Sequence, residues 1–306
     1  MKIQFFNGGL ANQTFQYIFA RYYELSHPGE MMYLDDSYFA VNTVHNGYEL
    51  EKVFGIKPHF LSECFDEEVW SYMLEEKKKG KSIPELMTEN GMELTFISEA
   101  GEGYHKFNPF SGMVNKVPTN IYYPAIQDIP GIVYYHGYWL NGEWFEDYRE
   151  RFIEELAFPV LKDEKNKGYL NQIESEPSVA IHIRRGDFVE LDMAIPANIY
   201  KVMVGQFREK IEASTEVEKK IQKWTAVIFS DDIEWCKANT QELGLNVFGD
   251  VIFVEGNIQG KNYMDMQLMS RCEGMIMSNS SFAYLAALLN TRKKIVVNPT
   301  GRKVMV

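Results

Sequence analysis

VAIHIRRGD, residues 179–187, passes directly from a short run of branched apolar residues into two adjacent arginines and a glycine. The apolar part predicts a buried strand. Four more short apolar runs follow, each separated from the next by sequence of helical character: Thr225–Phe229, Val251–Val254, Met275–Met277 and Ile295–Val297. This alternation predicts an α/β fold with a parallel, doubly wound sheet.

Polar clusters come directly after the first four of these strands. They are His182–Asp187, Ser230–Asp232, Glu255–Asn257 and Ser278–Ser281. Ligands of open parallel sheets bind at the carboxyl ends of the strands, so we expect the four clusters to converge on one crevice.

The arginines Arg184 and Arg185 suit a phosphate ligand. A guanidinium grips phosphate oxygens in pairs and stays charged at any relevant pH. A diphosphate leaving group needs such a partner, because negative charge grows on its oxygens as the bond to it breaks. The alternative is a surface arginine pair bonded to a nearby acid such as Asp187, and for an isolated pair this alternative is the commoner case. The position at a strand end favours the phosphate site.

A second candidate anion site is the stretch SNSSFA, residues 278–283, between a strand and a helix rich in alanine and leucine. A helix start leaves amide hydrogens for an anion, and serine hydroxyls add donors. The alternative is an ordinary serine cap on a buried helix. The candidate ligand-binding residues here are Asn279, Ser280, Ser281 and Phe282.

Two acids, Asp231 and Asp265, lie between these segments in the sequence. A carboxylate can accept hydrogen bonds from the ring and exocyclic nitrogens of guanine. Either acid could instead be a helix cap or a surface residue, and Asp231, followed by Asp232 and a helix, fits a cap well. Asp265 is therefore the better candidate for reading a base.

The N-terminal half predicts a strand, a glycine loop and a helix in turn, at Ile3–Phe6, Gly8–Gln13 and Thr14–Leu25. Asn12 in the loop offers both a donor and an acceptor. The stretch 36–120 reads as irregular apart from a helix at Asp66–Lys79, whose charged end we interpret as solvated. We also predict strands at Met31–Leu34 and Ile132–Tyr135, and an amphipathic helix that carries Phe145, Tyr148, Phe152 and Leu156 on one stripe. We predict a junction in the polar segment 162–177, which gives domains of residues 1–165 and 166–306.

The bulk composition describes an ordinary globular protein, with 45% hydrophobic and 24% charged residues. A net charge of -12 disfavours nonspecific binding to nucleic acid. The scattered Cys64, Cys236 and Cys272 suit neither a disulfide framework nor a zinc site, so a reducing compartment fits best. No signal peptide or membrane-spanning run is recognisable, and we expect a cytoplasmic protein whose peripheral association with a membrane stays open. No two aspartates are separated by a single residue and the histidines are scattered, so we expect neither a catalytic metal nor a cofactor.

The motifs at Gly8–Gln13, His182–Asp187, Phe229–Asp232 and Ser278–Leu289 together resemble those of alpha-1,2-fucosyltransferases, with spacing that covers nearly the whole chain. The His-x-Arg-Arg-Gly-Asp stretch is similar to the donor signature of alpha-1,6- and protein O-fucosyltransferases, and Gly137-Tyr138-Trp139 also resembles the family. The resemblance implies a GT-B architecture, with two Rossmann-like domains facing each other across a cleft. It also implies GDP-fucose as donor for the C-terminal domain, an acceptor-side N-terminal domain, and inversion without a metal.

The resemblance also implies roles for individual residues. Arg184 would bind the donor diphosphate with His182 and Arg185 beside it, and Ser281 and Phe282 would line the phosphate and fucose side. Asp265 is similar in position to an acid that reads guanine. We expect Arg184, His182 and Asn12 to be catalytic. Ala11 departs from the family, which more usually has glycine there.

We therefore expect transfer of L-fucose from GDP-fucose to the 2-hydroxyl of a terminal beta-galactoside. A glycan-binding module without turnover and a transferase using another GDP-sugar, such as GDP-mannose, are the alternatives. The general base stays open among His182, Asp187, Asp35 and Asp36. The acceptor's identity and the oligomeric state stay open as well.

Overall fold

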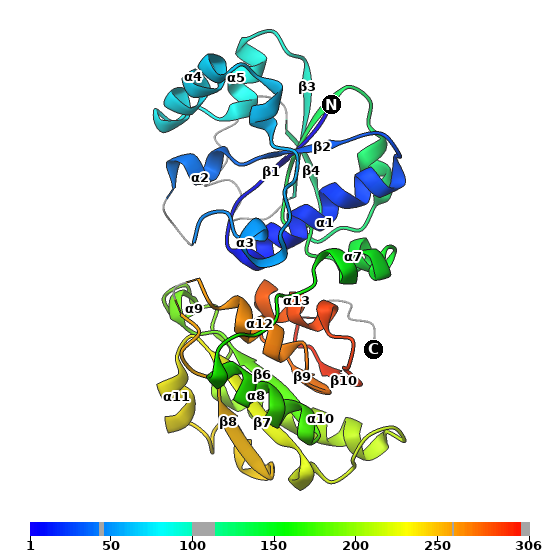
Figure 1. Ribbon diagram of the computed structural model, residues 1–306, viewed down its shortest axis with the longest axis vertical. Helices are drawn as coiled ribbons and strands as arrows, with labels where there is room; N and C mark the ends of the chain where they lie inside the picture. Colours follow the sequence, from blue (N-terminus) through cyan, green and yellow to red (C-terminus); the bar gives the residue numbers. More distant parts are fainter. Residues whose placement is uncertain (43–45, 100–113, 259, 301–306) are drawn as a thin grey trace. The chain divides into compact units, whose positions relative to one another are not determined.

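The computed structural model describes residues 1–42, 46–99, 114–258 and 260–300. The chain divides into two compact units, Met1–Ala157 (unit 1) and Phe158–Val306 (unit 2), where the sequence analysis placed the division at 165/166. Each unit holds a five-stranded sheet in which every pairing is parallel, with helices packed against it (Figure 1). The predicted α/β class with two Rossmann-like units is confirmed.

The sheet of unit 1 has the strand order β2-β1-β5-β3-β4. Its strands are β1 (Lys2–Phe5), β2 (Met32–Asp35), β3 (Leu94–Glu99), β4 (Val114–Val117) and β5 (Ile132–His136). Its helices are α1 (Leu10–Ser26), α2 (Ser37–Val41), α3 (Leu50–Phe54), α4 (Glu67–Lys78), α5 (Ile83–Glu89), α6 (Glu143–Glu146) and α7 (Arg149–Glu155), with 3-10 turns at Leu61–Cys64 and Pro124–Asp128.

Unit 1 differs from the sequence-based expectation in several places. α1 begins at Leu10 and not at Thr14, so part of the expected glycine loop is helical. β3 and β4 lie in the stretch 36–120 that was read as irregular, part of which, 43–45 and 100–113, lies outside the described residues. β3 enters the sheet because Phe96 and Ile97 are buried there. The single amphipathic segment expected after residue 144 is two short helices, α6 and α7, although its stripe still packs inward, with Phe145 and Phe152 stacked at 5.6 Å.

The sheet of unit 2 has the strand order β10-β9-β6-β7-β8. Its strands are β6 (Ser178–Ile183), β7 (Thr225–Ser230), β8 (Asp250–Phe253), β9 (Gly274–Ile276) and β10 (Ile295–Val297). Its helices are α8 (Glu164–Ser175), α9 (Gly186–Glu190), α10 (Ala197–Ala213), α11 (Ile233–Ala238), α12 (Tyr263–Met269) and α13 (Ser281–Leu289), with 3-10 turns at Ile221–Lys223 and Leu245–Val247. All five predicted strands are present, each within one residue of its expected bounds.

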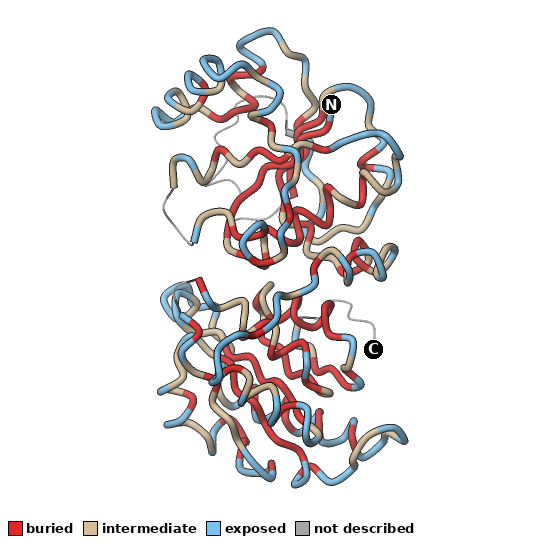
Figure 2. The backbone as a smooth tube through the Cα atoms, viewed as in Figure 1, coloured by how far each residue is buried: buried red, intermediate tan, exposed pale blue. Residues whose placement is uncertain are grey.

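Burial explains why unit 2 was the easier half to predict. Every residue of β6 is buried and the other central strands are largely buried, whereas the edge strand β8 is partly exposed (Figure 2). α13 is buried on all sides from Ala283 to Leu288, as its apolar composition requires. Since the central strands contact side chains on both faces, their sequences are continuous apolar runs.

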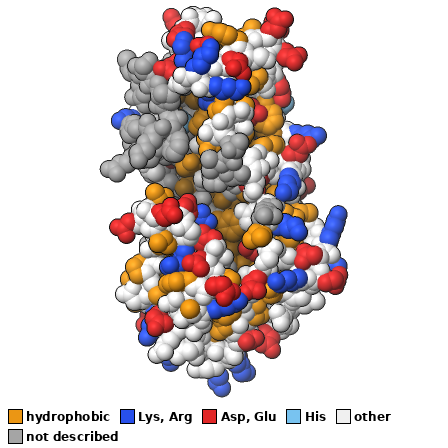
Figure 3. All heavy atoms as spheres, turned by 90° about the vertical axis from the view of Figure 1, so that its left-hand side faces the viewer, with side chains coloured by type: hydrophobic (Ala, Val, Ile, Leu, Met, Phe, Trp, Pro, Cys, Tyr) orange, Lys and Arg blue, Asp and Glu red, His pale blue; other side chains and the backbone are white. Residues whose placement is uncertain are grey.

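The surface carries acidic and basic side chains interspersed over both units (Figure 3). Many form exposed pairs along helices, such as Lys79–Glu76 at 2.7 Å and Arg208–Glu212 at 2.9 Å. Such pairs contribute little to stability, roughly 0–1 kcal/mol each. Within the part of the chain that the structure describes, no helix is both long and apolar enough to cross a membrane.

Candidate active site

Arg184 follows β6 and is held by two carboxylates. Its Nη2 donates to Asp187 Oδ1 at 2.6 Å, and its Nη1 lies 2.9 Å from Asp231 Oδ2. The guanidinium carbon is 5.4 Å from the centre of the Phe188 ring. About a third of the side chain, 34%, stays exposed. Arg184 therefore forms the ion pair with Asp187 that the sequence suggested. This pair orients the Arg184 guanidinium, which still contacts solvent.

Arg185 is the more enclosed of the two arginines. Its Nε donates to Asp232 Oδ2 at 3.0 Å, and its guanidinium carbon lies 3.7 Å from the centre of the Trp235 ring. Asp232 also accepts from the backbone N–H of Trp235 at 3.2 Å and so caps α11. Arg185 is thereby fixed between a helix cap and an aromatic face, which leaves Arg184 as the better-placed cation for a ligand.

Asp231 supports the arginine segment from the next strand. Besides its contact with Arg184, it accepts the backbone N–H of Arg185 through Oδ1 at 2.8 Å. A Cβ at Gly186 would lie 2.5 Å from Asp231 Oδ2, so only glycine leaves room for this carboxylate. The sequence favoured Asp231 as the helix cap, but the N-cap of α11 is Asp232, and both oxygens of Asp231 are engaged in the turn after β6.

His182 connects the two candidate anion segments. Its Nδ1 lies 2.8 Å from Ser278 Oγ, and its ring stacks on Phe282 at 5.6 Å. Ser278 Oγ also accepts the N–H of Ser280 at 3.2 Å, so its own hydrogen is available to the imidazole. Burial, and then the charge of Arg184, lowers the pKa of His182 to about 3. The ring is therefore neutral at physiological pH.

The segment after β9 forms the start of α13. Ser280 is its N-cap and accepts the N–H of Phe282 at 3.2 Å. Asn279 Nδ2 donates to the carbonyl of Met193 at 2.9 Å, while its buried Oδ1 has no hydrogen-bond partner among the described residues. Ser281 opens the helix itself. The segment is therefore both a serine cap and the start of a helix. His182 links it to the end of β6.

Asp265 lies in the first turn of α12 and is bound by a network of asparagines. Asn257 Nδ2 donates to its Oδ1 at 2.7 Å. Burial raises the pKa of Asp265 to about 7, against the opposing effect of this hydrogen bond. The amides of Asn257 and Asn166, both buried, bond reciprocally at 2.8 and 2.9 Å. Asn257 belongs to the polar cluster expected after β8, but sequence reasoning missed its pairing with Asn166, because the two residues lie 91 positions apart.

The Gly8 loop of unit 1 is built around backbone hydrogen bonds. Gly8 has a φ of +81°, which favours glycine, and Gln13 Nε2 donates to the carbonyls of Gly8 and Gly47 at 2.8 Å each. The buried Glu49 accepts the N–H of Leu10 at 3.0 Å. Ala11 and the partly exposed Asn12 lie in the first turn of α1, so position 11 is helical and accommodates alanine.

Glu99 at the end of β3 organises the neighbouring loops. Its carboxylate accepts backbone N–H groups from Asn120 at 2.7 Å, Tyr138 at 2.8 Å and Trp139 at 3.1 Å. Trp139 has a φ of +54°, in the left-handed region, and is fully buried. A Cβ at Gly137 would lie 2.8 Å from Glu99 Oε2. The motif Gly137-Tyr138-Trp139 is therefore a structural loop wrapped around a buried carboxylate.

Across residues 1–42, 46–99, 114–258 and 260–300, no cluster of three or more metal-ligating acidic, cysteine or histidine side chains occurs. The arginines that follow β6 place two cations at the carboxyl edge of unit 2. Paired arginines, a capped helix start and a buried neutral imidazole together form an arrangement suited to a phosphate ester.

Comparison with known proteins assigns the chain to a family. The profile described as glycosyl transferase family 11 matches residues 123–303, more than half of the chain and all of the segment that carries these groups. This chain belongs to glycosyl transferase family 11. The resemblance to alpha-1,2-fucosyltransferases stated from the motifs is confirmed.

Relatives of this family 11 chain cover most of its length. An alpha-1,2-colitosyltransferase of Escherichia coli is 28% identical over 295 residues, which span 96% of this chain and 89% of that protein. A galactoside alpha-(1,2)-fucosyltransferase 2 of Rattus norvegicus is 25% identical over 191 residues, 58% of this chain and 52% of that protein. Among solved structures, the fucosyltransferase NodZ from Bradyrhizobium is similar with a TM-score of 0.47 and 14% identity, over 94% of this chain and 92% of that chain.

Proposed function

We propose that this protein transfers L-fucose from GDP-fucose to the 2-hydroxyl of a terminal beta-galactoside, forming an alpha-1,2 linkage with inversion and without a metal. The observation that carries the proposal is the arginine at the end of β6. Arg184 is oriented by Asp187 and Asp231, remains one-third exposed, and adjoins the segment that His182 links to α13. The family and its named relatives support the reaction class.

The donor diphosphate would be held by charge and by helix geometry. Its oxygens would take the place of Asp187 at Arg184, while Asp231 keeps the guanidinium in position. The start of α13, at Ser281 and Phe282, supplies the positive end of a helix dipole. These groups gain strength as the bond to fucose breaks, because charge then accumulates on the leaving diphosphate.

The guanine would be read by Asp265. An ionised carboxylate can accept from the ring N–H and the exocyclic amino group of guanine together. Asn257 occupies one oxygen of Asp265 and fixes its direction, and Asn166 fixes Asn257 in turn. With a pKa of about 7 the carboxyl is only half ionised at neutral pH, so the nucleotide would draw it into the charged form.

Of the four groups left open as the general base, Asp36 has the pKa best suited to the task. His182, with a pKa of about 3, is a weak base at neutral pH. Asp35 accepts hydrogen bonds from Tyr134 and from the N–H of Ser37, and Asp187 pairs with Arg184. Burial, with the nearby Asp35, raises the pKa of Asp36 to about 6, close to the range in which a base works best.

A second donor merits a test because of one relative. The alpha-1,2-colitosyltransferase is similar over 96% of this chain. Colitose is L-fucose without its 3-hydroxyl, so both sugars could use the same nucleotide site. A site that hydrogen-bonds the 3-hydroxyl would reject the deoxy sugar strongly, by up to about 10⁴-fold.

The test is a screen of donors and acceptors read by GDP release. GDP-fucose, GDP-colitose and GDP-mannose would each be combined with lactose, lacto-N-biose and N-acetyllactosamine, and the product linkage determined by NMR. We expect release with GDP-fucose plus a galactoside, unchanged by EDTA and lost in Arg184→Ala. Arg208→Ala is the matched control, because Arg208 pairs with Glu212 on the exposed face of α10. Binding of GDP without release under any combination would indicate a non-catalytic module and contradict the proposal.

A further inference from the structure

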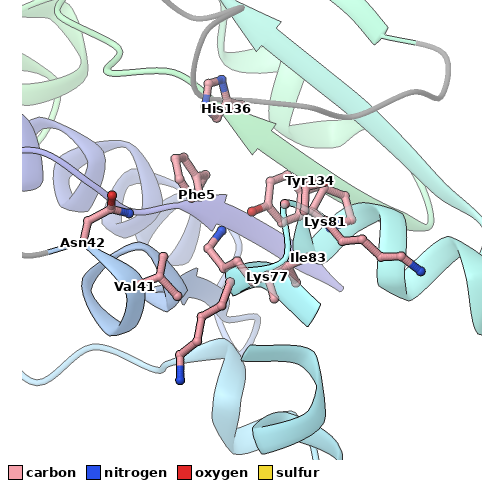
Figure 4. A pocket seen from close by; sticks show the side chains of 12 residues that line it. Phe5, Val41, Asn42, Lys77, Lys81, Ile83, Tyr134 and His136 are labelled. Carbon is pink, nitrogen blue, oxygen red and sulfur yellow. The ribbon is translucent and has the colours of Figure 1, made fainter. Parts of the chain in front are cut away.

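Unit 1 contains a cavity of about 360 Å³ beside the carboxyl ends of β1 and β5 (Figure 4). Its twelve lining residues come from those strands, from α2 and its end, from α4, and from the turn into α5: Phe5, Val41, Asn42, Lys77, Lys78, Gly80, Lys81, Ser82, Ile83, Pro84, Tyr134 and His136. The loops of Gly8 and Gly137 leave the sheet at the same edge, directly after these two strands. Ligands of parallel sheets bind at this edge.

The charge of the lining is opposite to that of the whole chain. The lining holds three lysines and neither aspartate nor glutamate, whereas the sequence has 43 acidic and 31 basic residues. On the face drawn in Figure 3 the two signs are interspersed. The cavity therefore concentrates positive charge in a protein that otherwise repels anions.

Lys77 is the lysine that can act inside the cavity. Figure 4 shows it pointing toward Phe5, with Nζ 5.4 Å from the ring centre. Lys78 and Lys81 pair with Glu75 and Glu89 at 2.6 and 2.7 Å, and Lys81 points away from His136 in the figure. Over the described ranges, Lys77 forms no ion pair with a carboxylate. Its ammonium is thus held over an aromatic face without a counter-charge.

The aromatic part of the lining is packed and neutral. Phe5 stacks on His136 at 4.9 Å and meets Tyr38 edge-on at 6.3 Å. Burial, and then the charge of Lys77, lowers the pKa of His136 to about 3, so the imidazole carries no charge. The hydroxyl of Tyr134 donates to Asp35. The ammonium of Lys77 is therefore the group that would select a ligand by charge.

The size of the cavity favours an acidic sugar over a small inorganic anion. Its volume lies at the lower end of the range of small-molecule sites, about 300–1,000 Å³. A bare phosphate or sulfate would leave most of it empty, whereas a pyranose ring with one acidic substituent would fill it. The hydroxyls of such a ring could use Asn42 and Ser82, which line the same space.

We propose that this cavity binds an acidic sugar residue of the acceptor glycan, with the sugar's carboxylate on the ammonium of Lys77. This inference rests on the proposed function, since it names the class of acceptor which that reaction uses. The acceptor would then be a galactoside linked to a uronic acid, and Lys77 a residue that determines acceptor specificity.

The test compares two acceptors that differ in one group. Lactose and galactosyl-β-1,4-glucuronic acid are the same disaccharide except that a carboxylate replaces one hydroxymethyl group. We expect the wild-type protein to have a KM for the acid at least tenfold lower, with a similar kcat. Lys77→Met should abolish this preference and Lys77→Arg should retain most of it. Lys79→Met, at the C-cap of the same helix and outside the cavity lining, should leave it unchanged.

The outcomes separate the two proposals. Turnover of both acceptors with equal KM would overturn the inference and leave the proposed function standing. If neither acceptor is used, the cavity is tested by itself. Saturation-transfer NMR then measures binding of methyl β-D-glucuronide and methyl β-D-glucoside. A glucuronide signal that is lost in Lys77→Met supports the inference. Two results would overturn the inference: retention of the acid preference in Lys77→Met, or competition by inorganic phosphate as strong as that by the glucuronide. Circular dichroism of each variant checks that it is folded.

Discussion

The carboxyl edges of the two sheets use acidic side chains for opposite purposes. In unit 2, Asp187, Asp231 and Asp232 bind guanidinium groups and orient positive charge near solvent. In unit 1, the buried Glu49 and Glu99 accept backbone N–H groups and fix the shape of loops. Two parallel sheets of different strand order thus use these acids to orient positive charge in one unit and to fix loop shape in the other. Substitutions of these five acids should therefore affect chemistry in unit 2 and folding in unit 1.

The largest effect should come from Arg184→Ala. Loss of the guanidinium removes stabilisation of the leaving diphosphate and should lower kcat/KM about 10²–10³-fold, roughly 3–4 kcal/mol. The melting temperature should change little, because the side chain is one-third exposed. Initial-rate kinetics and thermal denaturation measure the two effects, with Arg208→Ala as control. A loss below tenfold would remove Arg184 from this role.

Glu99→Gln should show the reverse behaviour. The amide offers one acceptor oxygen where three backbone N–H groups now bind a carboxylate, and it faces them with a donor of its own. Unit 1 should lose about 2–3 kcal/mol, since hydrogen bonds to charged groups are worth about 1.5–3 kcal/mol. Hydrogen exchange resolved by mass spectrometry should place the faster exchange in unit 1. Weaker GDP binding with unchanged protection of unit 1 would contradict the contrast between the edges.

Asp231→Asn tests whether an acid in unit 2 acts through an arginine. The amide can still accept from the N–H of Arg185 but no longer attracts Arg184, which now lies 2.9 Å away. We expect kcat/KM to fall about thirtyfold, roughly 2 kcal/mol and less than in Arg184→Ala, as for the loss of a hydrogen-bonded partner of a charged group. Glu212→Gln, which frees Arg208 in the same way at an exposed site, should leave the rate unchanged. Equal activity of Asp231→Asn and wild type would show that the arginine needs no such support.

The smallest effect concerns pH and Asp265. If only the ionised carboxyl binds guanine, a pKa of about 7 predicts GDP binding about tenfold weaker at pH 6 than at pH 8. The sign for stability is opposite. Because the folded pKa lies above the ordinary 3.8, the folded state holds the proton more tightly, and this group's contribution to stability falls as the pH rises from about 4 to 7.

Calorimetry of GDP binding and urea denaturation across pH 5–8 measure both trends. In Asp265→Asn both pH dependences should disappear. A GDP affinity in the wild-type protein that does not vary between pH 6 and 8 would indicate that the base is read elsewhere.

The sequence predicted the features that depend on neighbouring residues, namely the strands of unit 2 and the arginines that follow the first of them. The strands of unit 2 were predictable because their residues are apolar on both faces, and the arginines were found because they follow such a strand. β3 was missed because Leu94–Glu99 mixes apolar residues with Thr95, Ser98 and Glu99, and pairing with β5 makes it a strand.

Side-chain direction was less predictable still. Lys77 belongs to a charged segment that reads as a solvated helix end, yet it points toward Phe5. Asn166 and Asn257 carry no sequence signal of their pairing. Those contacts join segments that are far apart in the chain. Periodicity and motif spacing do not predict such contacts.

The reciprocal amide pair has a consequence for how unit 2 could be isolated. The sheet of this unit starts at Ser178, but Asn166 lies in the helix before it, where Asp163 caps that helix and binds the same amide at 3.0 Å. A fragment that begins at β6 would retain every strand of unit 2. It would still lose Asn166, which holds Asn257 against Asp265. A fragment made to test nucleotide binding by unit 2 alone should therefore begin no later than Asp163.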